Sequence, residues 1–238
     1  MARRLAISLV VLPGLDGTAT MHADFVAAAR RLFDAISVIA YPPNRTLGYA
    51  ELETLVRASL PEGGPFVLLG ESFSGPIALS IAANPPAGLA GLVLSTTFAR
   101  SPVPLLSSLA SVLRFAPVRP IPMFLLSWLL LGQWATAQLK TELQAALNQV
   151  DPGVLRARAA AALRVDVSSA LSRISLQTLY LRATRDRLLA RTASTELSGA
   201  LSNSQVVDIE GPHLLLQANP EACVRAIGSF VEKLGALR

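Results

Sequence analysis

The chain of 238 residues is long enough for one large domain, or for a core domain with a small insertion. Hydrophobic residues make up 52% of the chain and charged residues only 16%, a balance that excludes an intrinsically disordered protein. The net charge of +5 comes from scattered arginines rather than from a basic run with interleaved aromatic residues, so we do not expect a nucleic-acid partner.

The beginning of the chain has two arginines followed by an apolar run, which superficially resembles a secretory signal. We interpret residues 5–12 instead as a first buried strand, because cleavage near Ala23 would remove a glycine loop that the chemistry below requires. The single cysteine, Cys223, excludes an internal disulfide framework and is typical of a reducing compartment. We therefore expect a cytoplasmic protein.

Short apolar runs and amphipathic segments alternate over the first hundred residues. Runs of this length bounded by Gly and Pro predict buried strands, and apolar spacing of three to four residues predicts helices. In chain order we expect a strand at 5–12, a helix at 21–32, a strand at 36–41, a helix at 46–60, a strand at 66–69, a helix at 76–82 and a strand at 89–95. This alternation predicts a parallel sheet covered by helices on both faces.

The alternation stops after Arg100, where Leu- and Ala-rich helical segments broken by prolines continue to Leu171. It resumes with a strand at 176–181, a helix at 189–201, a strand at 205–209 and a helix at 220–234. We predict an α/β fold in which a mostly parallel central sheet flanked by helices is formed by residues 1–99 and 172–238. Residues 100–171 would form a helical cap over the C-terminal ends of the strands, where open α/β sheets bind ligands.

One stretch of this predicted cap carries no charge, from after Arg119 to before Lys140. Its length is marginal for a membrane span, which needs about 20 apolar residues, and its prolines and glutamines count against one. We favour an apolar cap that lines a hydrophobic pocket or touches a membrane surface, with Phe124 and Trp128 as candidate pocket residues. The plainer alternative is that these side chains and their neighbours pack onto the core.

The stretch from Gly70 to Gly75, GESFSG, joins an apolar strand to a helix rich in small residues. A serine in a sharp turn between strand and helix is the structural context of the G-x-S-x-G nucleophile motif, and it makes Ser72 the candidate nucleophile. The helix that follows would direct its N-terminal N–H groups toward the same point. Ser74 stands where glycine is usual, which we interpret as a tolerated small residue. The alternative is a Gly/Ser-rich turn that binds phosphate or nothing.

A serine hydroxyl becomes nucleophilic only when a histidine accepts its proton and an acid orients that histidine. The chain has two histidines, too few for a multi-histidine metal site. His213 directly follows the last predicted strand, at the same sheet edge as Ser72, whereas we expect His22 to face solvent or to cap a helix locally. Asp186 follows the first strand after the insertion and is our candidate acid, the alternative being a surface aspartate neutralised by its two arginine neighbours.

Acyl transfer also needs donors for the oxyanion that develops on the attacked carbonyl. The N–H of Phe73, just after the candidate nucleophile, is one such donor. The loop PGLDG after the first strand supplies the other, for which we assign the N–H of Leu15, with Asp16 as the neighbouring alternative. The plainer interpretation of this loop is an ordinary glycine-rich turn.

Four segments, VLPGLDGT, LLGESFSG, LYLRATRDRLL and EGPHLLLQANP, together resemble the α/β-hydrolase fold superfamily, over nearly the whole chain apart from the cap. The first and last also resemble small bacterial esterase-like hydrolases and the hydrolase-like part of plastid phytyl-ester synthases. Two departures are Ser74 and the pair Pro13-Gly14, where His-Gly is usual. Neither departure removes a catalytic group.

These observations predict a serine hydrolase that cleaves a small-molecule ester or thioester with an apolar moiety, through an acyl-enzyme and without cofactor or metal. Ser72, Asp186 and His213 follow one another along the chain in the order of the α/β-hydrolases that the sequence resembles, and would act as nucleophile, orienting acid and general base. Two alternatives stay open: an acyltransferase that uses the same acyl-enzyme, and a non-catalytic protein that binds an apolar ligand. Peripheral membrane contact through the cap is also open, and the sequence does not indicate an oligomeric state.

Overall fold

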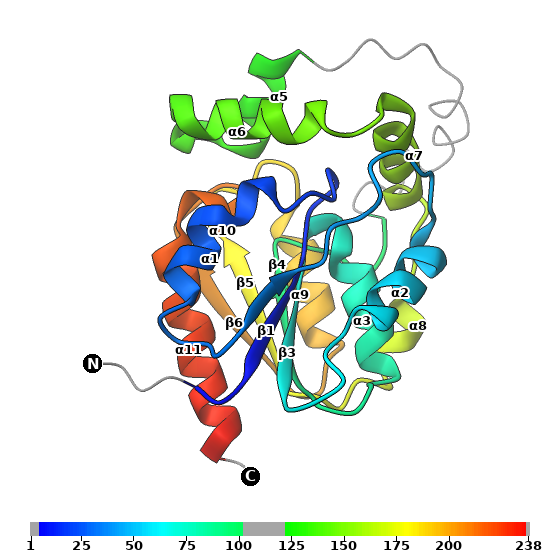
Figure 1. Ribbon diagram of the computed structural model, residues 1–238, viewed down its shortest axis with the longest axis vertical. Helices are drawn as coiled ribbons and strands as arrows, with labels where there is room; N and C mark the ends of the chain where they lie inside the picture. Colours follow the sequence, from blue (N-terminus) through cyan, green and yellow to red (C-terminus); the bar gives the residue numbers. More distant parts are fainter. Residues whose placement is uncertain (1–4, 102–121, 237–238) are drawn as a thin grey trace.

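The computed structural model describes residues 5–101 and 122–236. Within these residues one sheet of six parallel strands runs through the centre of the molecule, in the order β2-β1-β3-β4-β5-β6 (Figure 1). The strands are β1 (Ser8–Leu12), β2 (Ile36–Val38), β3 (Phe66–Glu71), β4 (Leu89–Ser95), β5 (Thr178–Ala183) and β6 (Ser204–Ile209). The predicted parallel α/β sheet is confirmed.

The strands lie within a few residues of where the sequence predicts them, and β4 has the predicted bounds. Strand β3 is buried along its whole length between β1 and β4. It runs beyond its predicted end at Leu69, because Gly70 and Glu71 still pair with Leu94 and Ser95 of β4. The candidate nucleophile therefore follows directly on the last paired residue of a central strand.

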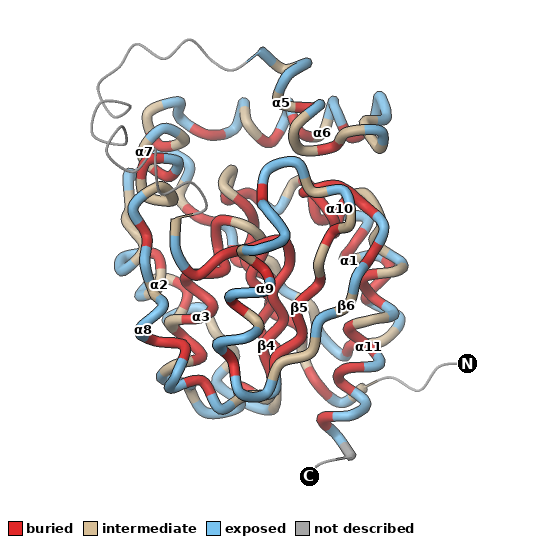
Figure 2. The backbone as a smooth tube through the Cα atoms, turned by 180° about the vertical axis from the view of Figure 1, so that it is seen from behind, coloured by how far each residue is buried: buried red, intermediate tan, exposed pale blue. Residues whose placement is uncertain are grey.

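Helices cover both faces of the sheet, as Figures 1 and 2 show. Successive residues of a strand point to opposite faces, so Leu9 and Val11 of β1 enter one hydrophobic cluster and Val10 and Leu12 the other. The first face is covered by α1 (Ala23–Ala29), α10 (Leu215–Ala218) and α11 (Pro220–Ala236), and the second by α2 (Tyr49–Ala58), α3 (Gly75–Ala83) and α9 (Arg191–Gly199). Buried residues concentrate in the strands and on the helix surfaces that face them (Figure 2).

A separate layer of helices lies over the loops that follow the strands (Figure 1). It contains α5 (Met123–Leu130), η4 (Gly132–Trp134), α6 (Ala137–Asn148) and α7 (Pro152–Ala162), which we call the overlying helices. The backbone N–H of Leu214 donates to Leu130 O at 3.1 Å, and that of Asp151 donates to Pro43 O at 2.9 Å. A small hydrophobic cluster that includes Met21, Leu143 and Leu214 packs α6 onto the loops beneath.

The last residues of the predicted cap pack into the core and not over the strand ends. Helix α8 (Ser168–Leu171) contributes Leu171 to the main core cluster on the α3 side of the sheet rather than lying over the strand ends. The prolines of the insertion from Pro102 to Pro120 fall outside the described residues. Among the residues that the structure describes, no helix is both long and apolar enough to cross a membrane.

Candidate active site

Ser72 occupies a strained turn at the end of the central strand. It begins the 3-10 helix η2 (Ser72–Ser74) between β3 and α3, and its φ of 46° lies in the left-handed region that a residue with a side chain rarely adopts. The strand and α3 pass so close that a Cβ on Gly70 would come within 2.7 Å of Ala78 Cβ, which explains the glycine before Ser72. The Thr97 hydroxyl donates a hydrogen bond to the Ser72 carbonyl and helps to fix the turn.

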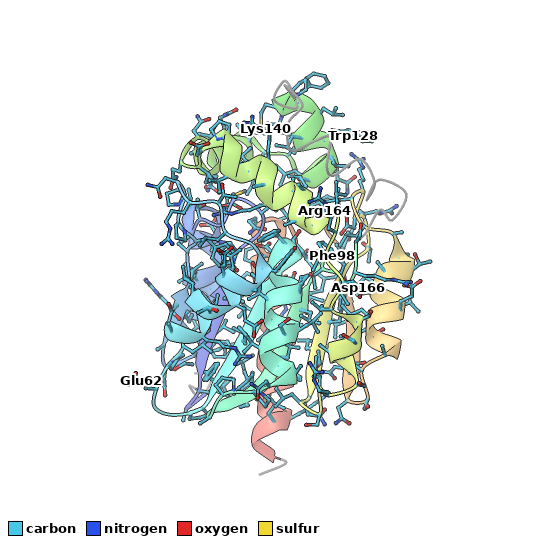
Figure 3. The ribbon with its side chains drawn as sticks, turned by 90° about the vertical axis from the view of Figure 1, so that its right-hand side faces the viewer. Glu62, Phe98, Trp128, Lys140, Arg164 and Asp166 are labelled. Atoms are coloured by element: carbon cyan, nitrogen blue, oxygen red, sulfur yellow. The ribbon has the colours of Figure 1, made fainter. Side chains whose placement is uncertain are left out.

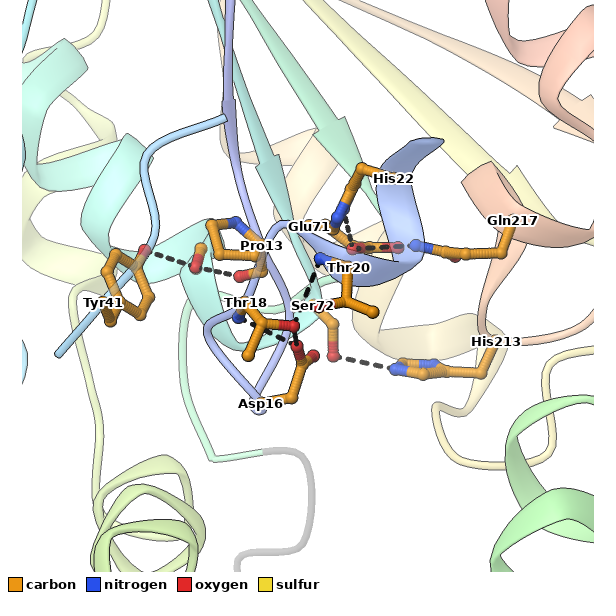
Figure 4. Close-up of polar contacts among 11 residues, drawn as sticks. Pro13, Asp16, Thr18, Thr20, His22, Tyr41, Glu71, Ser72, His213 and Gln217 are labelled. Atoms are coloured by element: carbon orange, nitrogen blue, oxygen red, sulfur yellow. Dashed lines mark hydrogen bonds and ion pairs between the residues drawn. The ribbon is translucent and has the colours of Figure 1, made fainter. Parts of the chain in front are cut away.

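Ser72, His213 and Asp186 form one continuous chain of hydrogen bonds. The Oγ of Ser72 lies 2.8 Å from His213 Nε2, a contact drawn in Figure 4, and His213 Nδ1 lies 2.9 Å from Asp186 Oδ2. The three residues follow β3, β6 and β5, so the parallel sheet delivers all of them to one edge. His213 and Asp186 are both nearly buried.

The surroundings of Asp186 favour its charged form. Burial raises the pKa of Asp186, but the charge and hydrogen bond of His213 and two backbone N–H groups lower it by more, so the pKa lies below its usual value. The backbone donors are those of Leu188 and Leu189, at 2.8 and 2.9 Å from Oδ1. A carboxylate at this place holds the proton of the neutral imidazole on Nδ1, so His213 Nε2 can accept the proton of the Ser72 hydroxyl.

The loop after β1 lies directly beside the serine turn. Its backbone closes on itself, since the Gly17 N–H donates to Gly14 O at 3.0 Å. The Asp16 carboxylate accepts hydrogen bonds from the N–H and hydroxyl of Thr18 (Figure 4). Leu15 and Asp16 are both partly exposed, on the loop that carries the Leu15 N–H assigned to the oxyanion and its alternative, the Asp16 N–H. Their role toward an oxyanion stays a prediction, as does that of the Phe73 N–H.

Ser74 is more than a tolerated small residue. It is fully buried, its hydroxyl donates to the carbonyl of Pro13, and the Tyr41 hydroxyl lies 2.6 Å from the same oxygen (Figure 4). Because the Ser74 proton goes to Pro13, Tyr41 is the donor in the second bond. A glycine here could make neither bond, so the departure from the usual motif ties the serine turn to the loop after β1.

Solved structures resemble this architecture over nearly the whole chain, whereas no family model and no curated protein sequence matches it. An enol-lactonase from Burkholderia xenovorans matches with a TM-score of 0.78 at 16% identity, over 96% of this chain and 92% of that one. An esterase from Thermogutta terrifontis gives 0.75 at 23%, over 97% and 91%. MGS-M2, an α/β-hydrolase from a deep-sea metagenome library of the Medee basin, gives 0.73 at 15%, over 98% and 91%.

The chain has the α/β-hydrolase fold. The fold that the four sequence segments predicted is thus confirmed, and in it Ser72 lies at the strand-to-helix turn where such a motif is expected.

Beside the serine turn, the structure holds a buried ionisable pair that the sequence interpretation missed. The expectation that His22 faces solvent is wrong, because its side chain is 1% exposed. It occupies the N-cap position of α1 without a side-chain capping hydrogen bond, and its Nε2 lies 2.9 Å from Oε2 of Glu71, also 1% exposed. Gln217 Nε2 donates to the same carboxylate oxygen at 3.4 Å (Figure 4). Burial lowers the pKa of His22, but the Glu71 carboxylate raises it by more, so it lies above its usual value. A glutamate in a buried strand needs a partner for its charge. The position of Glu71 at the end of a predicted buried strand was therefore the sequence signal from which this pair could have been inferred.

The two candidate pocket residues lie on the outside of α5. The plainer alternative, that they pack onto the core, is wrong, because Phe124 is 77% and Trp128 55% exposed. They border a surface hollow of about 430 Å³ that also contacts Lys140, and Figure 3 shows Trp128 and Lys140 together on the overlying helices. The Arg187 guanidinium lies 4.6 Å from the centroid of the Trp128 ring and donates to the Trp128 carbonyl at 2.8 Å. Trp128 therefore neighbours the loop that carries Asp186, and a role toward substrate stays a prediction.

Proposed function

We propose that this protein is a serine hydrolase that cleaves a carboxylic ester or thioester with an apolar acyl or alcohol part. The observation that carries the proposal is the chain of hydrogen bonds from Ser72 through His213 to Asp186, with 2.8 and 2.9 Å between the bonded atoms. Such a chain is the arrangement that activates a serine for acyl transfer. The structural neighbours named as an esterase and an enol-lactonase support an ester as the substrate class.

In the first half of the reaction, the Ser72 hydroxyl attacks the carbonyl carbon of the substrate while His213 Nε2 takes its proton. Asp186 keeps the imidazole in the required tautomer and stabilises the imidazolium that forms. Negative charge develops on the former carbonyl oxygen, and the N–H groups of Phe73 and of Leu15, or of Asp16 in its place, would hold it. His213 then gives its proton to the leaving alcohol or thiol, and the acyl-enzyme remains.

In the second half, a water molecule attacks the acyl-enzyme while His213 again takes the proton, and collapse of the second tetrahedral intermediate releases the acid and restores Ser72. We assign the overlying helices, which fall within the predicted cap of residues 100–171, as the part that covers this site. Among the described residues, these helices rest on the loops after β1, β2 and β6. Phe124 and Trp128 would contact the apolar part of the substrate from this cap.

The proposal is tested by labelling with a fluorophosphonate, which reacts with an activated serine. Wild type should be labelled and should hydrolyse p-nitrophenyl esters, and Ser74→Ala should retain the label because its hydroxyl is engaged with Pro13 and Tyr41. Ser72→Ala should lose both label and turnover while keeping its circular-dichroism spectrum. Well-folded wild type without label would contradict the proposal and favour a non-catalytic protein that binds an apolar ligand.

A further inference from the structure

Helix α7 carries an arginine that is almost completely buried. Arg158 is 1% exposed and, among the residues that the structure describes, is the largest fully buried side chain, whereas Arg156, on the same helix, is exposed. Arginine is rarely buried to this extent unless its charge and its N–H groups are satisfied. The hydrogen-bond partners of the Arg158 guanidinium therefore indicate the role of this side chain.

The partners of Arg158 are backbone carbonyls of the loops beneath it. Its Nη1 donates to Leu15 O at 3.2 Å and to Asp16 O at 2.6 Å, and its Nη2 donates to Pro42 O at 3.0 Å. The guanidinium also lies 5.6 Å from the centroid of the Tyr41 ring. A single side chain of α7 thus holds two consecutive peptide units of the loop that the proposed mechanism uses.

Gly17 shows how closely Arg158 approaches this loop. It adopts a φ of 69°, and a Cβ at this position would come within 2.5 Å of Arg158 Nη1. The glycine of the PGLDG segment is therefore needed both for its backbone conformation and for the room that the guanidinium takes.

The carbonyl contacts determine where the candidate oxyanion donors point. In a planar trans peptide the C=O and the following N–H point in opposite directions. The Leu15 carbonyl shares its peptide plane with the Asp16 N–H, so Arg158 fixes the direction of that donor. The Gly14 carbonyl shares its plane with the Leu15 N–H, and its bond from Gly17 fixes the second donor. Arg158 also holds the Asp16 carbonyl, whose plane contains the Gly17 N–H that closes the turn.

We propose that Arg158 is a positioning residue: from α7 it holds the Leu15 and Asp16 peptide units in the orientation that presents an N–H to the oxyanion formed on Ser72. This rests on the proposed function, because an oxyanion forms there only if Ser72 attacks a carbonyl carbon. It follows that α7 is coupled to the active site, since a displacement of α7 would release the loop.

The first test is hydrogen–deuterium exchange, which needs no activity. In Arg158→Met, the peptide covering residues 13–18 should exchange about 10-fold faster than in wild type, because the loop opens locally without its donor. Arg156→Met, an exposed position on the same helix, is the matched control and should leave this peptide unchanged. Exchange in the peptide of β3 should stay the same in both variants, which shows that the fold persists. Unchanged exchange of residues 13–18 in Arg158→Met would overturn the inference.

The second test uses kinetics to distinguish two roles of Arg158: orienting the oxyanion donor, and only attaching α7 to the loop after β1. Arg158→Met should lower kcat on p-nitrophenyl butyrate by about 10- to 100-fold with little change in KM. The reason is that a misoriented N–H donor weakens the stabilisation of the transition state more than the binding of the substrate. A trifluoromethyl ketone provides a second kinetic measurement. The Ser72 Oγ adds to its carbonyl carbon, the hydroxyl proton passes to His213, and the former carbonyl oxygen becomes an oxyanion. The affinity of Arg158→Met for this inhibitor should decrease by a factor similar to that in kcat. Arg158→Lys should recover only part of kcat, because one ammonium cannot reach three carbonyls in the geometry of a guanidinium.

The outcomes discriminate between the two proposals. Active wild type with an unchanged kcat in Arg158→Met would overturn the positioning role alone, as would a raised KM with kcat preserved. Wild type that neither reacts with fluorophosphonate nor turns over ester would overturn the proposed function and, with it, the oxyanion role of Arg158. A changed pH profile of kcat in Arg158→Met would place the effect on His213 and contradict the inference as well.

Discussion

Replacing His22 by leucine should destabilise the protein strongly, because it leaves Glu71 buried without its cation. Both side chains are 1% exposed and their closest atoms lie 2.9 Å apart. Removing one partner of a buried ion pair costs about 3–5 kcal/mol, since the remaining charge has lost its compensation and stays out of water. Gln217 can offset only part of this loss. Its side-chain amide is neutral, and it makes a single long hydrogen bond of 3.4 Å to the Glu71 carboxylate.

The contribution of this pair should depend on pH with a defined sign. The pKa of His22 lies above its usual value in the folded protein, because Glu71 stabilises the imidazolium. A group whose pKa is raised on folding stabilises the folded state fully below its unfolded pKa, which is about 6.5 for histidine. The contribution decreases as the pH rises through the raised pKa. The difference in free energy of unfolding between wild type and the double variant His22→Leu/Glu71→Leu, which lacks both titrating groups, should therefore shrink as the pH increases above about 6.5.

Urea unfolding of four proteins at several pH values measures both effects: wild type, His22→Leu, Glu71→Leu and the double variant. The double variant should be more stable than either single variant, because two apolar side chains leave no buried charge. Taking the difference between wild type and the double variant at each pH cancels the titration of groups outside the pair. A His22→Leu variant within about 0.5 kcal/mol of wild type would refute the reasoning, as would a difference between wild type and the double variant that grows as the pH rises above about 6.5.

Three further predictions concern the serine turn and the cap. Ser72→Ala and His213→Gln should each lower kcat for p-nitrophenyl esters by about 10⁴- to 10⁶-fold at unchanged stability, and a loss below about tenfold would contradict their roles. Ser74→Ala should lower the free energy of unfolding by about 1–3 kcal/mol in urea melts, because a buried carbonyl and a buried phenol lose their partner, and an unchanged melt would contradict this. Phe124→Ser and Trp128→Ser should weaken turnover of long-chain esters more than of short-chain ones, whereas equal loss on both would indicate impaired folding.

Most of the fold could be predicted because its signals are local. Each strand is a short apolar run between turn residues, and β4 could be located to the residue from that pattern alone. The residues that meet at Ser72 could be predicted for a related reason: His213 and Asp186 each follow a strand, and parallel strands end at the same edge of a sheet. Order along the chain was enough to place these three side chains close together.

Other features of the site depend on packing between distant segments. The contacts of Arg158 with Leu15 and Asp16 join residues 143 and 142 positions apart, and nothing in the composition of α7 distinguishes Arg158 from the exposed Arg156. In the same way the exposure of Trp128 could not be derived from the apolar stretch that contains it. Hydrophobicity alone does not determine which face of α5 packs against other helices.

The sequence by itself determined the alternation of strands and helices and the three polar residues at the strand ends. These follow from periodicity and chain order, which act over a few residues at a time. Only the tertiary structure decided that His22 is buried against Glu71, that the Ser74 hydroxyl joins two loops, and that Arg158 reaches the backbone beneath α7. Each of these is a hydrogen bond between segments far apart in the chain, and such partners exist only after the helices have packed on the sheet.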